Sequence, residues 1–244
     1  ILELRHKLHA NPDLSNAEYK TAGIIKDFIA EHNPTEIIEG IRGAGLAAVY
    51  KFPKKGPTIA IRCELDALPI QEPNPIPYKS NNIGVSHKCG HDGHMAIVAS
   101  LAAWLSEQPL ESGSVVLLFQ PAEEMGEGAK RVVEDEKFSR LQIDHVFALH
   151  NIPKEPMHSI ILTENGFSAE VISVVVKLKG KESHASEPEN GINPAVAISE
   201  LIQAIAKLNV SDISHPNFAI ITPVLINMGQ KSYGISPAQG ELHY

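Results

Sequence analysis

The feature that most constrains the fold is the alternation of apolar strand-like runs with helical patterns in residues 1–165. Apolar residues recur at helical spacing in some segments and form short continuous runs in others. The expected helices cover 18–31, 95–105 and 129–138, and the expected strands cover 46–52, 58–63, 114–119 and 144–149. Strands that are apolar almost throughout are typical of sheets buried on both faces. We therefore expect an α/β sheet covered by helices on both faces.

Polar residues that could take part in chemistry follow these expected strands. They are Asp66, Glu123, Glu124 and His150, each placed after the end of an apolar run. In open α/β sheets, ligand sites collect at the carboxyl ends of the strands. The positions of these side chains therefore predict a functional site at one edge of the sheet.

The pattern changes near residue 165. Residues 169–178 alternate between apolar and polar, as in a half-exposed strand, and an amphipathic helix follows near 198–208. Further strand-like runs cover 219–225 and 240–244. We therefore expect two domains: residues 1–165 as part of a larger α/β domain, and residues 166–244 as part of a smaller α+β domain.

Composition excludes several classes of partner and sets the expected compartment. The formal net charge is −8 at pH 7, which argues against nucleic acid or an anionic membrane as the main partner. The chain has only two cysteines, so it lacks a disulfide framework, and this favours a reducing compartment such as the cytoplasm. The first residue is Ile1, not Met, so a leader could precede it.

The strongest chemical signal is a set of possible metal ligands. Cys89-Gly90-His91 places a thiol and an imidazole where both can reach one metal or two adjacent metals, although such pairs also occur by chance in surface loops. Glu124 and His150 extend the set to four ligands suited to zinc, manganese or a similar divalent metal. Glu123 is then a spare carboxylate that can act as a general base on water. Alternatively, Glu123 and Glu124 only stabilise the start of the following helix.

The number of ligands limits what this site can be. Four residues and one bridging water do not complete two metals of about four ligands each. The site is therefore either mononuclear or only partly contained in this chain. Among the other histidines of the chain, His9 is expected to be structural or exposed.

Further residues could support the metal site. Asp66 could accept a hydrogen bond from a metal-bound imidazole and so fix its tautomer, and Glu64 has a weaker claim to such a role. His184, in a loop of small residues, could donate to an oxyanion, or it could be an exposed loop residue. His94 opens a helix after the metal loop and could support or cap it, and His87 has the same ambiguity.

Three segments of the sequence resemble successive motifs of one enzyme family. They are Arg62-Cys63-Glu64-Leu65-Asp66-Ala67-Leu68-Pro69, His87-Lys88-Cys89-Gly90-His91-Asp92-Gly93-His94 and Phe119-Gln120-Pro121-Ala122-Glu123-Glu124. Weaker matches are Arg5–His9, His150–Pro153 and the loop around His184. The sequence resembles, over essentially its whole length, the N-acyl-amino-acid amidohydrolases, which include aminoacylases, hippurate hydrolases and indole-acetyl-amino-acid hydrolases and are related to two-metal carboxypeptidases.

This resemblance implies a mixed sheet in a two-metal exopeptidase-like catalytic domain, with a smaller α+β lid that forms a homodimer. Cys89 would bridge two divalent metals, zinc or manganese or alternatively nickel or cobalt, with His91, Glu124 and His150 as further ligands. Glu123 would be the general base, and His184 would reach the partner subunit's site and support the oxyanion. The family has one more histidine ligand far downstream, so the resemblance implies that this chain is C-terminally incomplete.

The expected reaction is hydrolysis of the amide bond of an N-acyl amino acid, which releases a carboxylic acid and an amino acid. Alternatives are a metallodipeptidase or carboxypeptidase, and an inactive homologue that only binds metal or ligand. The sequence departs from the family at Cys63 and Glu64, where the family usually has Ala and Asp, and at Tyr233–Pro237 in the lid. These departures leave the acyl and amino-acid preference open.

Overall fold

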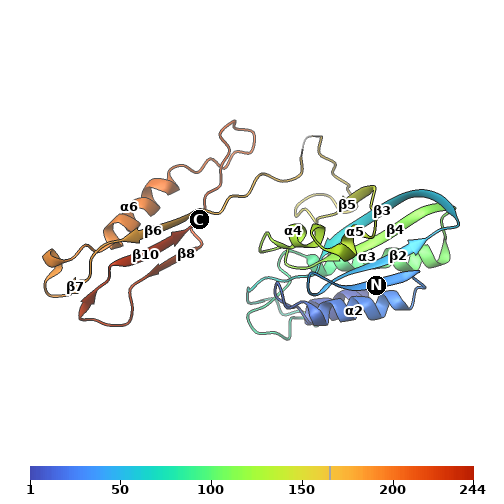
Figure 1. The fold of residues 1–244 in the computed structure, drawn as a ribbon, viewed down its shortest axis with the longest axis horizontal. Helices are drawn as coiled ribbons and strands as arrows, with labels where there is room; N and C mark the ends of the chain where they lie inside the picture. The colour runs from blue at the N-terminus through green and yellow to red at the C-terminus, as the bar shows by residue number, and fades with distance from the viewer. Residues whose placement is uncertain (165) are drawn as a thin grey trace. The chain divides into compact units, whose positions relative to one another are not determined.

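The computed structural model describes residues 1–164 and 166–244, which form two compact units, Ile1–Met157 and His158–Tyr244. Each unit has its own sheet (Figure 1). The predicted domain boundary falls at residue 165, which lies outside the described residues. No helix in the described part of the chain is both long enough and apolar enough to span a bilayer.

The first unit is built on a five-stranded mixed sheet with the order β1-β2-β4-β3-β5. Its strands are β1 (Glu36–Ile41), β2 (Gly45–Lys51), β3 (Lys54–Glu64), β4 (Ser112–Gln120) and β5 (His145–Ala148). Strands β3, β4 and β5 are parallel, whereas β2 runs antiparallel to both β1 and β4. The carboxyl ends of β3, β4 and β5 therefore lie at the same edge of the sheet. Asp66, Glu123, Glu124 and His150 follow these strand ends.

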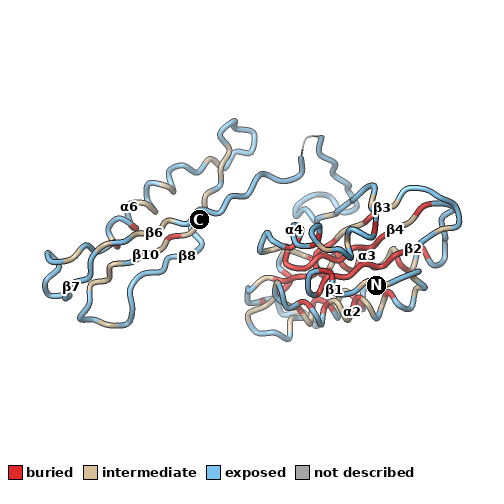
Figure 2. Tube along the Cα trace, in the orientation of Figure 1, coloured by how far each residue is buried: buried red, intermediate tan, exposed pale blue. Residues whose placement is uncertain are grey.

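Helices cover both faces of this sheet, which confirms the predicted fold class. They are α1 (Leu2–Ala10), α2 (Tyr19–Ala30), α3 (His91–Glu107), α4 (Gly128–Val133) and α5 (Glu136–Ser139). Side chains of α1, α2 and α3 pack on one face with Leu117 and Phe119 of β4. Val132 and Phe138 of the short helices pack on the other face with Val116 and Leu118. Figure 2 shows the buried residues concentrated in β2, in β4 and in α3.

Two sequence predictions for the first unit need correction. The single helix expected over 129–138 is divided into α4 and α5, because Asp135 between them is extended and its side chain caps α5 by accepting from Lys137 N. The strand expected to be buried over 144–149 is β5, whose four residues are all exposed. Among the described residues β5 pairs only with β3, so it forms an edge of the sheet.

The second unit contains a three-stranded antiparallel sheet with the order β6-β10-β8. Its regular elements are β6 (Val175–Lys179), β7 (Ser183–His184), the 3₁₀ helix η1 (Pro188–Asn190), α6 (Ala195–Ala206), β8 (Leu225–Met228), β9 (Ile235–Ser236) and β10 (Gln239–His243). The strands expected over 169–178 and 219–225 are shorter and later than predicted, because only residues 175–179 and 225–228 pair with β10.

The central strand β4 supplies a stability prediction. Leu117 is fully buried in the core beneath α1–α3, so Leu117→Ala is expected to lower the free energy of unfolding by about 2–5 kcal/mol. Ile97→Ala, on the exposed side of α3, is the matched control and should change it by less than about 0.5 kcal/mol. The single tryptophan, Trp104, lies in α3 and reports urea unfolding of this unit by fluorescence. Equal losses in the two variants would contradict the assigned core.

Candidate metal centre

The candidate ligands come from the loops at the carboxyl edge of the sheet and from the start of α3. Glu123 and Glu124 follow β4, and His150 lies two residues after β5. Cys89 and His91 flank Gly90, the residue that precedes α3 and has a φ of 91°. This left-handed conformation favours glycine, and a Cβ at Gly90 would lie 2.6 Å from the side-chain oxygen of Asn151. The tight turn thus sets a thiol and an imidazole on either side of one glycine.

The structure brings the five residues predicted for metal and base close together. The Sγ atom of Cys89 lies 3.4 Å from Nε2 of His150. Nε2 of His91 lies 3.7 Å from Oε1 of Glu124 and 3.9 Å from Oε2 of Glu123. One ligand atom from each of Cys89, His91 and His150 can be chosen so that all three lie within 4.8 Å of one another. Such spacing is what several side chains need to share one or two divalent cations.

Unsatisfied polar atoms indicate that the residues fit a cation. Nε2 of His91 and Oε1 of Glu124 are both buried and have no hydrogen-bond partner among the described residues. A buried polar atom without a partner costs about 1–3 kcal/mol, and few such atoms occur in folded proteins. Both atoms are lone-pair donors of the kind that divalent metals bind, and they face each other across 3.7 Å. A metal ion between these residues would satisfy both.

Asp66 holds His91 in the orientation that directs its Nε2 toward this space. Nδ1 of His91 contacts the backbone oxygen of Asp66 at 2.8 Å and Oδ1 of its carboxylate at 3.5 Å. The carboxylate also accepts hydrogen bonds from Ser15 Oγ at 2.7 Å and from the backbone N of Glu124 at 2.9 Å. Burial raises the pKa of Asp66, but the hydrogen bonds from His91, Glu124 and Ser15 outweigh burial and hold it below its usual value.

The electrostatics of the ligands also point to a cation. Burial, the charge of Glu124 and a hydrogen bond to Glu124 raise the pKa of the Cys89 thiol to about 12. Burial and then the charge of Glu124 raise the pKa of Glu123. Two carboxylates beside a thiol are unfavourable unless a cation is present. A bound divalent metal would lower the pKa of the Cys89 thiol and deprotonate it.

A second layer of residues behind the candidate ligands was mostly missed by the sequence prediction. His94 is buried, and its Nδ1 lies 2.8 Å from Oε2 of Glu64. Its Nε2 lies 2.6 Å from the side-chain oxygen and 3.0 Å from the backbone N of Asn151. The sequence left the role of His94 open and gave Glu64 only a weak claim. Asn151 could have been noticed because it directly follows His150.

Another buried polar cluster fixes the start of α3. Asp92 accepts from Arg5 Nε at 3.2 Å and contacts Nδ1 of His9 at 2.9 Å. His9, which was expected to be structural or exposed, is buried, and its other nitrogen lies 3.2 Å from Glu72. These contacts fix α1 to the turn that carries Cys89 and His91. His87 is also buried, and neither of its ring nitrogens has a hydrogen-bond partner among the described residues.

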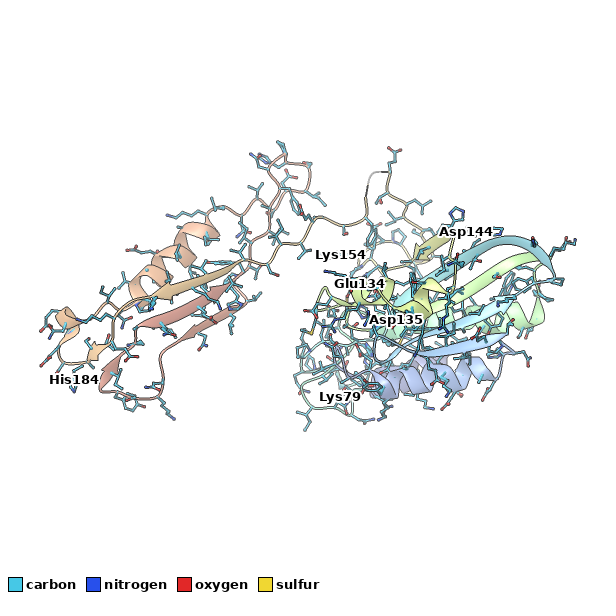
Figure 3. All side chains as sticks on the ribbon, in the orientation of Figure 1. Lys79, Glu134, Asp135, Asp144, Lys154 and His184 are labelled. Carbon is cyan, nitrogen blue, oxygen red and sulfur yellow. The ribbon has the colours of Figure 1, made fainter. Side chains whose placement is uncertain are left out.

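His184 belongs to the second unit. It lies on β7 (Figure 3). Its Nδ1 contacts Ser186 Oγ at 2.7 Å. The residue is exposed, which fits a side chain available to a ligand and equally fits an ordinary loop histidine. Its role in catalysis stays a prediction.

Comparisons with known proteins place these motifs in a family. Residues 60–227 match the profile of peptidase family M20/M25/M40. The chain is 36% identical over 230 residues to an N-acetyl-L-cysteine deacetylase of Bacillus subtilis (strain 168), covering 94% of this chain and 55% of that protein. It is 34% identical over 235 residues to a hippurate hydrolase of Campylobacter jejuni, covering 96% of this chain and 61% of that protein. The chain thus spans less than two thirds of the length of these relatives.

Solved structures agree with this assignment. A putative aminohydrolase from methicillin-resistant Staphylococcus aureus superposes with a TM-score of 0.71 at 29% identity, over 99% of this chain and 64% of that one. A dinuclear metal-binding peptidase of the M20 family from Bacillus subtilis gives a TM-score of 0.68 at 29% identity, over 99% and 62%. Because the family profile matches more than half of the sequence, the chain belongs to peptidase family M20/M25/M40.

Proposed function

We propose that the protein hydrolyses the amide bond of N-acyl amino acids in a metal-dependent reaction and releases a carboxylic acid and an amino acid. The observation that carries the proposal is the cluster of Cys89, His91, Glu124 and His150 with the separate carboxylate Glu123 beside it. Relatives named as N-acetyl-L-cysteine deacetylase and hippurate hydrolase support this substrate class. A site that only binds metal has no need of the additional carboxylate.

In this proposal Cys89, His91, Glu124 and His150 would hold two divalent metals. Zinc and manganese are the first choices for this mixture of sulfur, nitrogen and oxygen ligands, with nickel and cobalt as alternatives. Divalent metals in such a site lower the pKa of water and polarise a carbonyl oxygen.

The chain's own residues then move the proton and orient the groups. Glu123 takes a proton from the attacking water and passes it to the amine that leaves. Asp66 keeps His91 in the orientation seen here through the contact at His91 Nδ1. His184 donates a hydrogen bond to the developing oxyanion. On the resemblance of its loop to the family, we propose that His184 acts in the partner subunit of a homodimer formed through the second unit.

The two cysteines and the lack of a disulfide framework support a cytoplasmic location in this proposal. Both thiols are free, which fits a reducing compartment.

A substrate panel tests the proposal. The full-length protein, loaded in turn with zinc and manganese, is assayed against N-acetyl amino acids, N-benzoylglycine and dipeptides with a free amino group. Turnover of the N-acyl amino acids that disappears with a chelator and returns with metal is the expected result. A clear preference for dipeptides would identify a metallodipeptidase or carboxypeptidase instead. Normal metal binding without turnover of any substrate would identify a homologue that only binds metal or ligand.

A further inference from the structure

A continuous line of polar contacts runs behind the candidate metal ligands. Gln120, the last residue of β4, accepts from Arg62 Nε at 2.9 Å, and Arg62 forms an ion pair with Glu64. The other oxygen of Glu64 lies 2.8 Å from Nδ1 of His94. His94 in turn contacts Asn151. These five residues come from β3, β4, α3 and the loop after β5, so the line joins every segment that supplies a candidate ligand.

His94 connects the two halves of this line. A carboxylate only accepts, so Nδ1 of His94 donates to Glu64. Nε2 faces both the backbone N–H and the side-chain oxygen of Asn151, at 3.0 and 2.6 Å. A ring nitrogen carries either a proton or a lone pair, so only one of these two contacts is a hydrogen bond at a time. Either bond fixes Asn151 to α3.

Asn151 is placed to control two candidate ligands. It is the neighbour of His150 in the chain, and its side chain packs against Gly90, between Cys89 and His91. The Sγ of Cys89 and Nε2 of His150 are 3.4 Å apart. Movement of Asn151 would therefore change the separation of the thiol and the imidazole.

We propose that Glu64, His94 and Asn151 act as positioning residues that hold His150 against the Cys89-Gly90-His91 turn and so set the affinity for metal. None of the three needs to touch the metal, because their effect passes through His150 and the turn. Glu64 is anchored by Arg62 and is buried, so it provides a fixed end for the line. This inference rests on the proposed metal-dependent function.

The test measures metal affinity, which does not require turnover. Asn151→Ala removes the side chain at the exposed end of the line of contacts. Glu64→Gln removes the negative charge of the buried carboxylate that contacts His94. Each variant of the full-length protein is titrated with zinc against a competing chelator. The dissociation constant for zinc is expected to rise about 10- to 100-fold in each variant. Cys63→Ala, a buried neighbour of Glu64 outside the line, is the matched control and should leave it unchanged.

The double variant separates positioning from general damage to the fold. If both residues act through one line, Glu64→Gln combined with Asn151→Ala raises the dissociation constant by about as much as the larger single effect. Multiplied single effects, or an unchanged dissociation constant in Asn151→Ala, would overturn the inference. The cobalt-loaded protein gives a second readout, since the absorption band of a cobalt–thiolate bond should shift in Asn151→Ala and stay constant in Cys63→Ala.

The proposed function and this inference fail in different ways. A wild-type protein that binds no metal would overturn the proposed function and this inference with it. If the wild-type protein binds zinc, and Asn151→Ala and Glu64→Gln bind it equally tightly, the positioning role alone is overturned.

Discussion

Glu123→Gln is expected to lower kcat of the full-length protein by about 10²- to 10⁴-fold while leaving its metal content unchanged. Glutamine has nearly the same shape as glutamate but cannot take a proton from water. Oε2 of Glu123 lies 3.9 Å from Nε2 of His91, and 41% of its side chain is exposed. It is therefore close enough to the candidate metal ligands to meet a water there, and open enough to meet a substrate.

The contrast with Glu124 sharpens this expectation. Glu124 is more buried, with 21% of its side chain exposed, and its Oε1 lies 3.7 Å from Nε2 of His91. Glu124→Gln should therefore reduce metal content, whereas Glu123→Gln should not. Glu127→Gln is the matched control, because Glu127 is an exposed acid in the same segment and is paired with Arg131. If Glu123→Gln and Glu127→Gln both turn over substrate at the wild-type rate, Glu123 is not the general base.

Cys89→Ala is expected to raise the dissociation constant for zinc by more than about 100-fold, a larger effect than the loss of a supporting residue. In the proposed site the Cys89 thiolate would be one of the metal ligands, so its removal takes away one of the atoms that would hold the metal. Cys89 is also one of only two cysteines, so its thiol is easily followed by mass spectrometry after alkylation. In the wild-type protein, bound zinc should slow alkylation of Cys89.

Cys63 provides the control for this experiment. Burial, and then the charge of Glu64, raise the pKa of the Cys63 thiol well above its usual value, and the residue has no exposed surface. Cys63→Ala should bind zinc normally, and Cys63 should resist alkylation with or without metal. Equal loss of zinc in Cys63→Ala and Cys89→Ala would mean that the thiols act through packing and not through ligation.

Much of the first unit could be predicted from the sequence because its strands are apolar on both faces. In β4, Val116 and Leu118 pack on one side, and Leu117 and Phe119 pack on the other. This produces the continuous apolar run that predicts a covered strand. The same signal failed for β5, where Val146 and Phe147 are exposed. An apolar run shows that a strand can be buried, but it does not show how many neighbours the strand has.

The second unit was harder to predict because its strand ends depend on pairing. The alternating pattern over 169–178 predicts a strand of ten residues, but β10 pairs with residues 175–179 only. Local alternation gives the strand type, and the partner sets its length.

The candidate ligands could be predicted because metal ligands are chemically distinctive and here occur at short spacing or at strand ends. The residues that support them are different. His94 contacts Asn151 at a sequence separation of 57 residues, and His9 contacts Asp92 at a separation of 83. No local pattern connects such pairs, so only the folded chain reveals them.

X-ray absorption of the zinc-loaded full-length protein tests the central claim most directly, because it identifies the atoms bound to the metal. The account predicts a sulfur at about 2.3 Å and nitrogen or oxygen atoms at about 2.0–2.2 Å from zinc. It also predicts a second zinc at about 3.5–4 Å. The sulfur signal should disappear in Cys89→Ala and persist in Cys63→Ala. A zinc environment in the wild-type protein without sulfur would contradict the assignment of Cys89, and with it the proposed metal centre.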